Sequence, residues 1–112
     1  MASNKQGKPR RGEIYLTSLG ATLVIQNDVA NCVSDLTIVA PITSTVRFPL
    51  SPVGVLVEAS ATTGLSTISV ILLNQTRTVD RLRLIRRLGK VDAETLRQVD
   101  EAIQISLGLI PL

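Results

Sequence analysis

Residues 13–26 read EIYLTSLGATLVIQ and place two short apolar runs on either side of the GAT triplet at positions 20–22. The first run, residues 13–19, alternates apolar and polar side chains, which is typical of a β-strand with one buried face. The second run, residues 23–26, follows after only three residues. The pair therefore predicts a tight antiparallel hairpin, unless a longer connection has been taken out between the two strands.

Further short apolar runs follow the hairpin, and each is bounded by turn residues such as Gly, Pro, Asn or Ser. They lie at residues 36–42, 53–58 and 69–73, with a shorter one around residues 84–88. Such spacing is typical of a small antiparallel barrel or sandwich. Because Tyr15 and Phe48 are the only aromatic residues, we expect a core of Leu, Ile and Val, which favours strands.

The pattern changes near residue 91, where Asp92 can cap a helix that continues as AETLRQVDEAIQISLGL. Glu94 lies in its first turn, where a negative charge is favourable. Apolar residues recur at helical spacing and define one buried stripe: Leu96, Val99, Ile103, Leu107 and Ile110. Gly108 falls inside this pattern at a cost of about 1 kcal/mol relative to alanine. The expected fold class is mainly β with a C-terminal helix.

Length and composition place the chain among single-domain proteins. Its 112 residues predict one domain, residues 11–112, behind a flexible N-terminal tail of residues 1–10. The net charge of +3 is compatible with a polyanionic partner. A single cysteine, Cys32, with no histidine to activate it, is expected to be a buried or half-buried structural thiol. With no apolar segment long enough to span a membrane and no signal peptide, we expect a cytoplasmic protein.

The side chains available for chemistry are hydroxyls, carboxylates and arginines. The absence of histidine and the single cysteine exclude metal sites of the zinc type. In the segment APITSTVRFPL, residues 40–50, the hydroxyls of Thr43 and Ser44 and the guanidinium of Arg47 follow the end of a predicted strand. Such groups bind phosphate oxygens by hydrogen bonds. The alternative, that Ser and Thr merely form the turn, stays open.

A basic cluster, RTVDRLRLIRRLGK, covers residues 77–90 and carries six positive charges against only Asp80. If this segment is a strand, Arg81 and Arg83 share one of its faces. An ordinary solvated face is the alternative interpretation. We expect some of these arginines to pair with the acidic residues of the predicted helix, which are Asp92, Glu94, Asp100 and Glu101.

Several stretches taken together resemble one known family. They are RRGEIYL, LVIQNDVAN, IVAPIT, SVILLNQTRTVD, RRLGKV and VDEAIQISLGLI, which occur in this order from about Arg11 to Ile110. They are similar to the MazF/PemK toxins of bacterial type II toxin–antitoxin systems. The resemblance implies a small SH3-like barrel of the CcdB/MazF type, a homodimer, and a cognate MazE-like antitoxin. It also implies a sequence-specific endoribonuclease that needs neither metal nor cofactor and cuts single-stranded RNA, often mRNA, to 2′,3′-cyclic phosphate and 5′-hydroxyl ends.

The resemblance also implies roles for particular residues. Thr43 matches the catalytic threonine of the family and would hydrogen-bond a phosphate oxygen, with Ser44 as its assistant. The nucleophile, a ribose 2′-hydroxyl, belongs to the substrate, so the protein must orient the phosphate and stabilise its charge. Arg77 contacts the phosphate backbone or forms a buried salt bridge. The residues implied to bind RNA are Arg47, Phe48, Asn74, Gln75 and Arg77.

The hairpin departs from the family pattern. In the family, a flexible glycine-rich loop joins the first two strands and ends in an arginine–proline pair, and this arginine is the main catalytic group. No residue of this chain matches it. Three explanations stay open: the loop is mobile and left out of the numbering, it has been deleted to give a harmless toxin, or the natural chain lacks it. We favour the first because long active-site loops are often mobile.

The three explanations predict different structures. A loop left out of the numbering implies a break in the chain between Gly20 and Leu23. A continuous chain implies instead a three-residue hairpin loop at residues 20–22, with Gly20 or a neighbour at positive φ. It also favours a catalytically inactive decoy that binds antitoxin or RNA over the enzyme. A gyrase-binding toxin of the CcdB type shares the fold, but the PIT and QTRT stretches argue against it.

Overall fold

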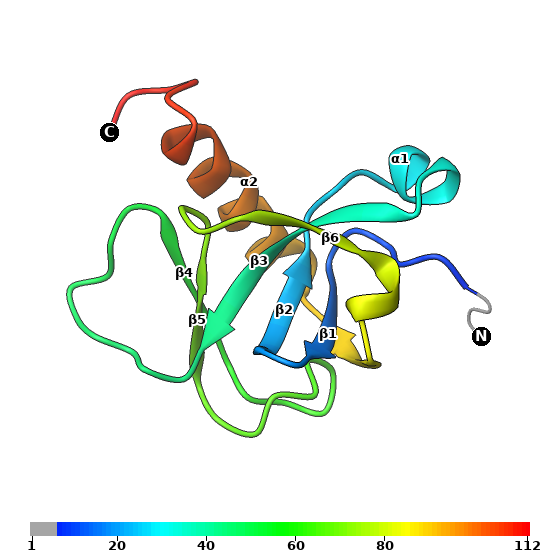
Figure 1. The fold of residues 1–112 in the computed structure, drawn as a ribbon. Coiled ribbons are helices and arrows are strands. Elements are labelled where there is room, and N and C mark those ends of the chain that lie inside the picture. Colours follow the sequence, from blue (N-terminus) through cyan, green and yellow to red (C-terminus); the bar gives the residue numbers. More distant parts are fainter. Residues whose placement is uncertain (1–6) are drawn as a thin grey trace.

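The computed structural model describes residues 7–112, in which a bent antiparallel sheet is covered on one face by a C-terminal helix (Figure 1). The strands are β1 (Glu13–Thr17), β2 (Gly20–Val24), β3 (Leu36–Thr43), β4 (Gly54–Val57), β5 (Ser69–Leu72), β6 (Arg77–Asp80) and β7 (Arg86–Lys90). The helical segments are α1 (Asp28–Val33), the 3₁₀ turn η1 (Arg81–Arg83) and α2 (Ala93–Ser106). The predicted fold class, mainly β with a C-terminal helix, is confirmed.

Strand β3 is the longest strand and joins the two halves of the sheet. Residues 36–39 pair with β6, residues 39–41 pair with β2, and the last two residues, Ile42 and Thr43, pair with β5. The strand order is β4-β5-β3-β2-β1-β7, with β6 paired to β3 beside this path. Because β3 serves both halves, it brings the start of the predicted phosphate segment close to β6, the first strand of the basic cluster.

The core lies between the sheet and α2, which packs on β4. Ile14, Leu23 and Ala40 are fully buried and come from neighbouring strands in register, so they form one continuous apolar face. Val99 of α2 is also fully buried against this cluster. Burying a side chain of this kind stabilises the fold by about 1.5–3 kcal/mol. The aliphatic core predicted from the composition is confirmed.

Helix α2 begins as predicted but ends earlier. The Asp92 carboxylate accepts a hydrogen bond from the backbone N–H of Thr95 at 2.8 Å and caps the helix. The helix ends at Ser106, and Gly108 follows with φ of +75°, a left-handed conformation that terminates helices. Leu107 is 67% exposed, so its predicted place in the buried stripe is wrong. Gly108 likewise lies beyond the helix and not inside it.

Three elements were not predicted from the sequence: α1, β6 and the 3₁₀ turn η1. The side chain of Asn27 caps α1 by accepting a hydrogen bond from the N–H of Ala30 at 2.8 Å. Cys32 lies on the solvent side of this short helix and is exposed. The prediction of a buried or half-buried thiol is therefore wrong. Strand β6 was not predicted because its sequence, RTVD, is polar and shows no apolar run. In the structure it is mostly exposed.

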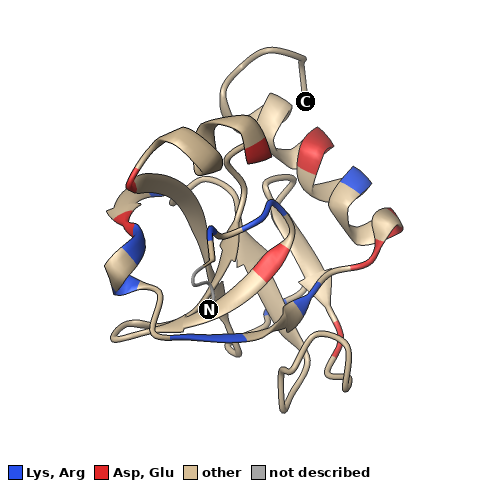
Figure 2. Ribbon diagram, turned by 90° about the vertical axis from the view of Figure 1, so that its right-hand side faces the viewer, with Lys and Arg blue, Asp and Glu red and all other residues tan. Residues whose placement is uncertain are grey.

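In the described part of the chain, the basic cluster forms no ion pair with the acidic helix. Arg81 and Arg83 lie on η1, so they do not share the face of a strand. Figure 2 shows the basic positions of η1 and β7 apart from the acidic positions of α2. The reason is topological, because β7 pairs with β1 at the sheet edge. The ion pairs formed by these two groups are Arg81–Asp35 (3.4 Å), Arg87–Glu13 (2.9 Å), Arg11–Asp100 (2.5 Å) and Arg97–Glu94 (2.8 Å).

The predicted flexible tail, residues 1–10, falls largely outside the described part of the chain, because residues 1–6 are not described. Residues 7–10 lie along the domain. Pro9 is buried, and the backbone N–H of Arg10 donates to the Glu13 carboxylate at 2.8 Å. No helix within residues 7–112 combines the length and the apolar character that a membrane crossing requires.

Candidate functional site

The hairpin that joins β1 to β2 turns over only two residues, Ser18 and Leu19, and Thr17 pairs directly with Gly20. The Thr17 hydroxyl closes the turn, since it accepts from the N–H of Leu19 at 3.1 Å and donates to the carbonyl of Gly20 at 2.9 Å. The chain is continuous here, so the expected break between Gly20 and Leu23 is wrong. The predicted positive φ is confirmed at Gly20, at +111°.

The observed turn also differs from the three-residue loop expected of a continuous chain. Residues 20–22 belong to β2 and not to the loop, because Gly20 already pairs with Thr17. The turn therefore comes two residues earlier and is one residue shorter than predicted. The consequence for function is direct, because the hairpin carries no segment that could hold an additional arginine.

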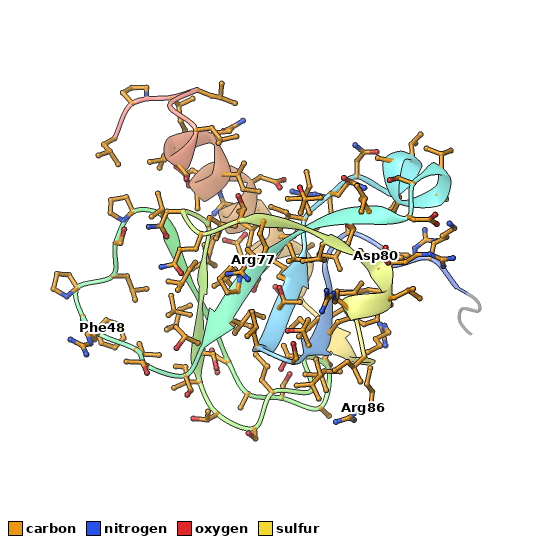
Figure 3. All side chains as sticks on the ribbon, in the orientation of Figure 1. Phe48, Arg77, Asp80 and Arg86 are labelled. Carbon is orange, nitrogen blue, oxygen red and sulfur yellow. The ribbon has the colours of Figure 1, made fainter. Side chains whose placement is uncertain are left out.

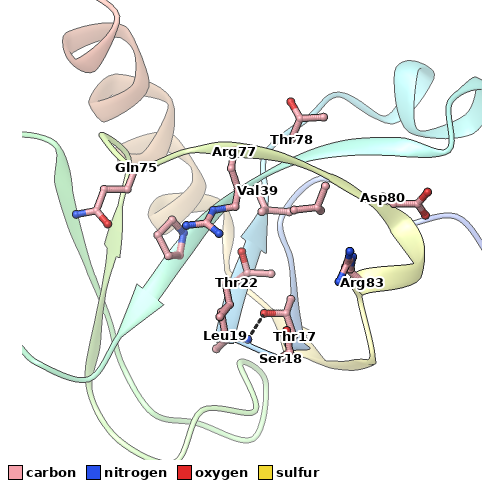
Figure 4. Close-up of a pocket in the computed structure, with 13 residues that line it drawn as sticks. Thr17, Ser18, Leu19, Thr22, Val39, Gln75, Arg77, Thr78, Asp80 and Arg83 are labelled. Atoms are coloured by element: carbon pink, nitrogen blue, oxygen red, sulfur yellow. Dashed lines mark hydrogen bonds between the residues drawn. The ribbon is translucent and has the colours of Figure 1, made fainter.

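A pocket of about 520 Å³ opens beside this hairpin, on the face of the sheet that points away from α2 (Figure 4). Its walls come from the hairpin on one side and from β6 and η1 on the other, and β3 contributes to the floor. The lining residues are Thr17, Ser18, Leu19, Ala21, Thr22, Val39, Pro41, Gln75, Arg77, Thr78, Val79, Asp80 and Arg83.

Strand register brings these distant residues together. Thr22 of β2 lies opposite Pro41 of β3, and Val39 lies opposite Arg77 of β6. Residues directly opposite each other in an antiparallel pair project to the same face, and so do residues two apart along one strand. Thr22, Val39, Pro41 and Arg77 therefore share the pocket face, whereas the core residue Leu23 points to the opposite face.

Two guanidinium groups give the pocket a positive character. Arg77 is exposed, and within residues 7–112 neither Arg77 nor Arg83 forms a salt bridge or a side-chain hydrogen bond. The buried salt bridge considered for Arg77 is therefore wrong. Asp80 adds one negative charge, and its carboxylate accepts from the N–H of Leu82 at 2.9 Å and caps η1. The pocket thus holds two positive charges and one negative charge.

The threonine hydroxyls at the pocket floor already donate to the backbone. Thr22 donates to the carbonyl of Ala40 at 2.9 Å, and Thr17 donates to that of Gly20. Each hydroxyl has one proton, so neither can also donate to a bound anion. Donors remain on the arginines, on the amide of Gln75 and on the hydroxyls of Ser18 and Thr78. The pocket can therefore hold an anion through its walls better than through its floor.

The structure brings only two of the predicted site residues, Gln75 and Arg77, into this pocket. Thr43 lies two residues beyond Pro41 on β3, so strand parity places it on the same face, outside the lining. Its hydroxyl accepts from the backbone N–H of Thr45 at 3.1 Å, which is a turn-forming contact. Ser44 follows it in an exposed bend.

The other predicted residues lie on exposed loops. Arg47 and Phe48 belong to the connection between β3 and β4, where Phe48 is 73% exposed and projects into solvent (Figure 3). Asn74 lies in the turn after β5 and is exposed. Arg83 was noted in the basic cluster but not as a site residue, because its place in the pocket depends on η1, which the sequence pattern does not indicate. Ser18 and Leu19 carried no sequence signal for a pocket.

A second polar cluster borders the sheet edge next to the pocket. Tyr15 lies opposite Thr22, and its hydroxyl donates to the Glu13 carboxylate at 3.1 Å. The guanidinium of Arg87 donates to the other oxygen of Glu13 at 2.9 Å. Burial, followed by the negative charge of Glu13, raises the pKa of Tyr15 to about 12. Tyr15 is therefore protonated at neutral pH and cannot act there as a general base.

Comparison with known proteins gives consistent matches over nearly the whole chain. The model of the PemK-like, MazF-like toxins of type II toxin–antitoxin systems matches residues 10–107. Endoribonuclease EndoA of Bacillus subtilis (strain 168) is 39% identical, and the alignment covers 90% of this chain and 96% of that protein. The alignment extends over 112 positions, so about a tenth of them have no residue in this chain.

Solved structures agree with this relationship. The toxin MazF-mt6 of Mycobacterium tuberculosis is 28% identical, with a TM-score of 0.76 and coverage of 90% of this chain and all of that one. A MazE–MazF crystal structure from Deinococcus radiodurans is 26% identical, with a TM-score of 0.78 and coverage of 93% of this chain and all of that one.

Proposed function

This chain belongs to the family of PemK-like and MazF-like endoribonuclease toxins of type II toxin–antitoxin systems, and we propose that it is itself a toxin that cuts single-stranded RNA. The observation that carries the proposal is its 39% identity to Endoribonuclease EndoA over nearly the full length of that protein. The likeness to solved MazF structures also confirms the predicted MazF-type fold.

The proposed reaction is a metal-independent transesterification. The ribose 2′-hydroxyl attacks the adjacent phosphorus, the bond to the 5′-oxygen breaks, and a 2′,3′-cyclic phosphate and a 5′-hydroxyl are released. Thr43 and Ser44 are the proposed catalytic residues, which hydrogen-bond the phosphate oxygens and stabilise the charge that develops on them. The residues proposed to bind the RNA are Arg47, Phe48, Asn74, Gln75 and Arg77.

The short hairpin lowers the expected rate. The loop arginine that would act on the 2′-hydroxyl and on the phosphate charge has no counterpart here. Removing one such electrostatic contact from a transition state typically costs about 3 kcal/mol, or about 10²-fold in rate. Cleavage by this chain is therefore proposed to be slow in comparison with relatives that keep the loop.

A second function is favoured by the same hairpin. A continuous chain without the arginine suits a catalytically inactive decoy that occupies RNA or antitoxin without cutting RNA. The discriminating experiment incubates the purified protein, in excess and in the presence of EDTA, with a mixed-sequence RNA. Discrete cuts that are lost in Thr43→Val support the toxin, whereas intact RNA that co-migrates with the protein supports the decoy.

The proposed partners follow from the solved relatives. The structures from Deinococcus radiodurans include MazE together with MazF, and we propose a MazE-like antitoxin for this chain. We also propose a homodimer, which sedimentation at micromolar concentration tests directly, since a monomer alone would contradict it. The cytoplasm is the proposed compartment, because mRNA is the proposed substrate.

A further inference from the structure

Arg83 is the cation in the pocket to which neither the sequence resemblance nor the comparisons give a role. It ends η1, which is held in place at both ends. Arg81, the first residue of η1, donates its backbone N–H to the carbonyl of Asp35 at 2.8 Å, and its guanidinium pairs with the Asp35 carboxylate. At the other end, the N–H of Ile85, two residues beyond η1, donates to the carbonyl of Leu16 in β1 at 2.8 Å. The segment that carries Arg83 is therefore anchored to the domain.

The same geometry separates the two arginines of η1. A 3₁₀ helix has about three residues per turn, so side chains two residues apart point in different directions. Arg81 turns towards Asp35, and Arg83 lines the hairpin pocket. Figure 4 shows Arg83 on the η1 side of the pocket and Arg77 over its β3 side, with Thr22 and Thr17 below. Two guanidinium groups from different elements thus flank one cavity.

The chemistry of the cavity favours a phosphodiester. Guanidinium groups bind phosphate oxygens in bidentate fashion. The cavity volume of about 520 Å³ lies within the range of about 300–1,000 Å³ that is usual for small-molecule sites. Val39, Pro41 and Leu19 add apolar lining against which a sugar can pack. The Asp80 carboxylate would repel an anion, but it is outnumbered by the two arginines.

We propose that the hairpin pocket holds a backbone phosphate of single-stranded RNA between Arg77 and Arg83. Arg83 thereby supplies, from η1, a positive charge beside the short hairpin that lacks the loop arginine. This inference rests on the proposed function only in taking RNA as the ligand. It assigns a phosphate-binding role to Arg83 and to the pocket beside the two-residue turn at Ser18 and Leu19.

The test measures RNA binding by fluorescence anisotropy, with a labelled pool of mixed-sequence 2′-O-methyl RNA that cannot be cleaved. Arg83→Gln is expected to weaken binding about tenfold, the usual effect of losing one charge-assisted hydrogen bond. It should also lower the slope of log K against log salt by about 0.7, the contribution of one phosphate on a single strand. The matched control is Arg86→Gln, an equal loss of charge on β7 outside the pocket, which should leave both quantities nearly unchanged.

A second variant is expected to change RNA affinity in the opposite direction. Asp80→Asn removes the negative charge but keeps a side-chain oxygen that can cap η1, and we expect it to bind RNA several-fold more tightly. If the wild-type protein binds RNA and Arg83→Gln binds it equally well, the pocket proposal is wrong and the proposed function stands. If the wild-type protein binds no RNA, both are wrong. Thermal melting confirms that each variant is folded.

Discussion

The Thr43→Val variant separates a catalytic hydroxyl from one that only shapes a turn. Valine keeps the branched shape of threonine and suits a strand, so β3 is preserved. Within residues 7–112, the one hydrogen bond lost is that from the N–H of Thr45, at 3.1 Å. Thr45 is exposed, so its N–H can bond to water instead, and the loss of stability is at most about 1 kcal/mol. Domains of this size are stable by about 5–15 kcal/mol, so the variant stays folded.

The effect on activity is expected to be much larger. If Thr43 holds a phosphate oxygen in the transition state, its loss costs about 3 kcal/mol, or about 10²-fold in rate. The assay is single-turnover cleavage of an end-labelled RNA, with urea unfolding measured in parallel. Thr43→Ser keeps the hydroxyl and should retain the rate within a few-fold. A decrease of less than about threefold in Thr43→Val, against the 10²-fold expected of a lost transition-state contact, would show that the hydroxyl serves the turn alone.

Three further predictions concern the fold. Gly20→Ala should destabilise by about 1–3 kcal/mol through backbone conformation alone, because φ is +111° and an added Cβ meets nothing within 4 Å; an unchanged urea midpoint would contradict the hairpin geometry. Val99→Ala should lower the free energy of unfolding by about 2 kcal/mol, since two methyl groups are removed from a fully buried site on α2. A change of less than about 0.5 kcal/mol, as is usual for surface substitutions, would contradict that placement. Tyr15, the only tyrosine in a chain without tryptophan, should ionise near pH 12, as followed by phenolate absorbance. Its folded pKa lies above the usual 10, so its contribution to stability is complete below pH 10 and is lost as the pH rises towards 12; a midpoint near 10 would show that Tyr15 is exposed to solvent.

Local signals in the sequence were enough to predict much of the fold. Asp92 and the spacing of Leu96, Val99 and Ile103 predicted α2, because capping and helical periodicity act within a few residues. The first five strands along the chain carry short alternating or continuous apolar runs, and all five were predicted. Strand β6 is polar and forms only because β3 offers it an edge, which is a long-range effect that no local pattern reports.

The candidate site was less predictable for the same reason. Arg77 reaches the pocket through its pairing with Val39, which is far away in the sequence. Arg83 depends on η1, where the chain turns after the Asp80 cap. The resemblance to the toxin family implied roles for Thr43 and Gln75, of which Gln75 lines the pocket, but it also described a loop that this chain lacks. The hairpin pocket borders the two-residue turn that stands in place of that loop.

The central claim, that this chain cuts single-stranded RNA by transesterification, is tested most directly by the chemistry of the ends it produces. RNA digested in EDTA by an excess of the purified protein is analysed by mass spectrometry and end mapping. The account predicts discrete sites that carry a 2′,3′-cyclic phosphate on one fragment and a 5′-hydroxyl on the other. RNA that stays intact, or fragments that end in a 3′-hydroxyl and a 5′-phosphate, would contradict it.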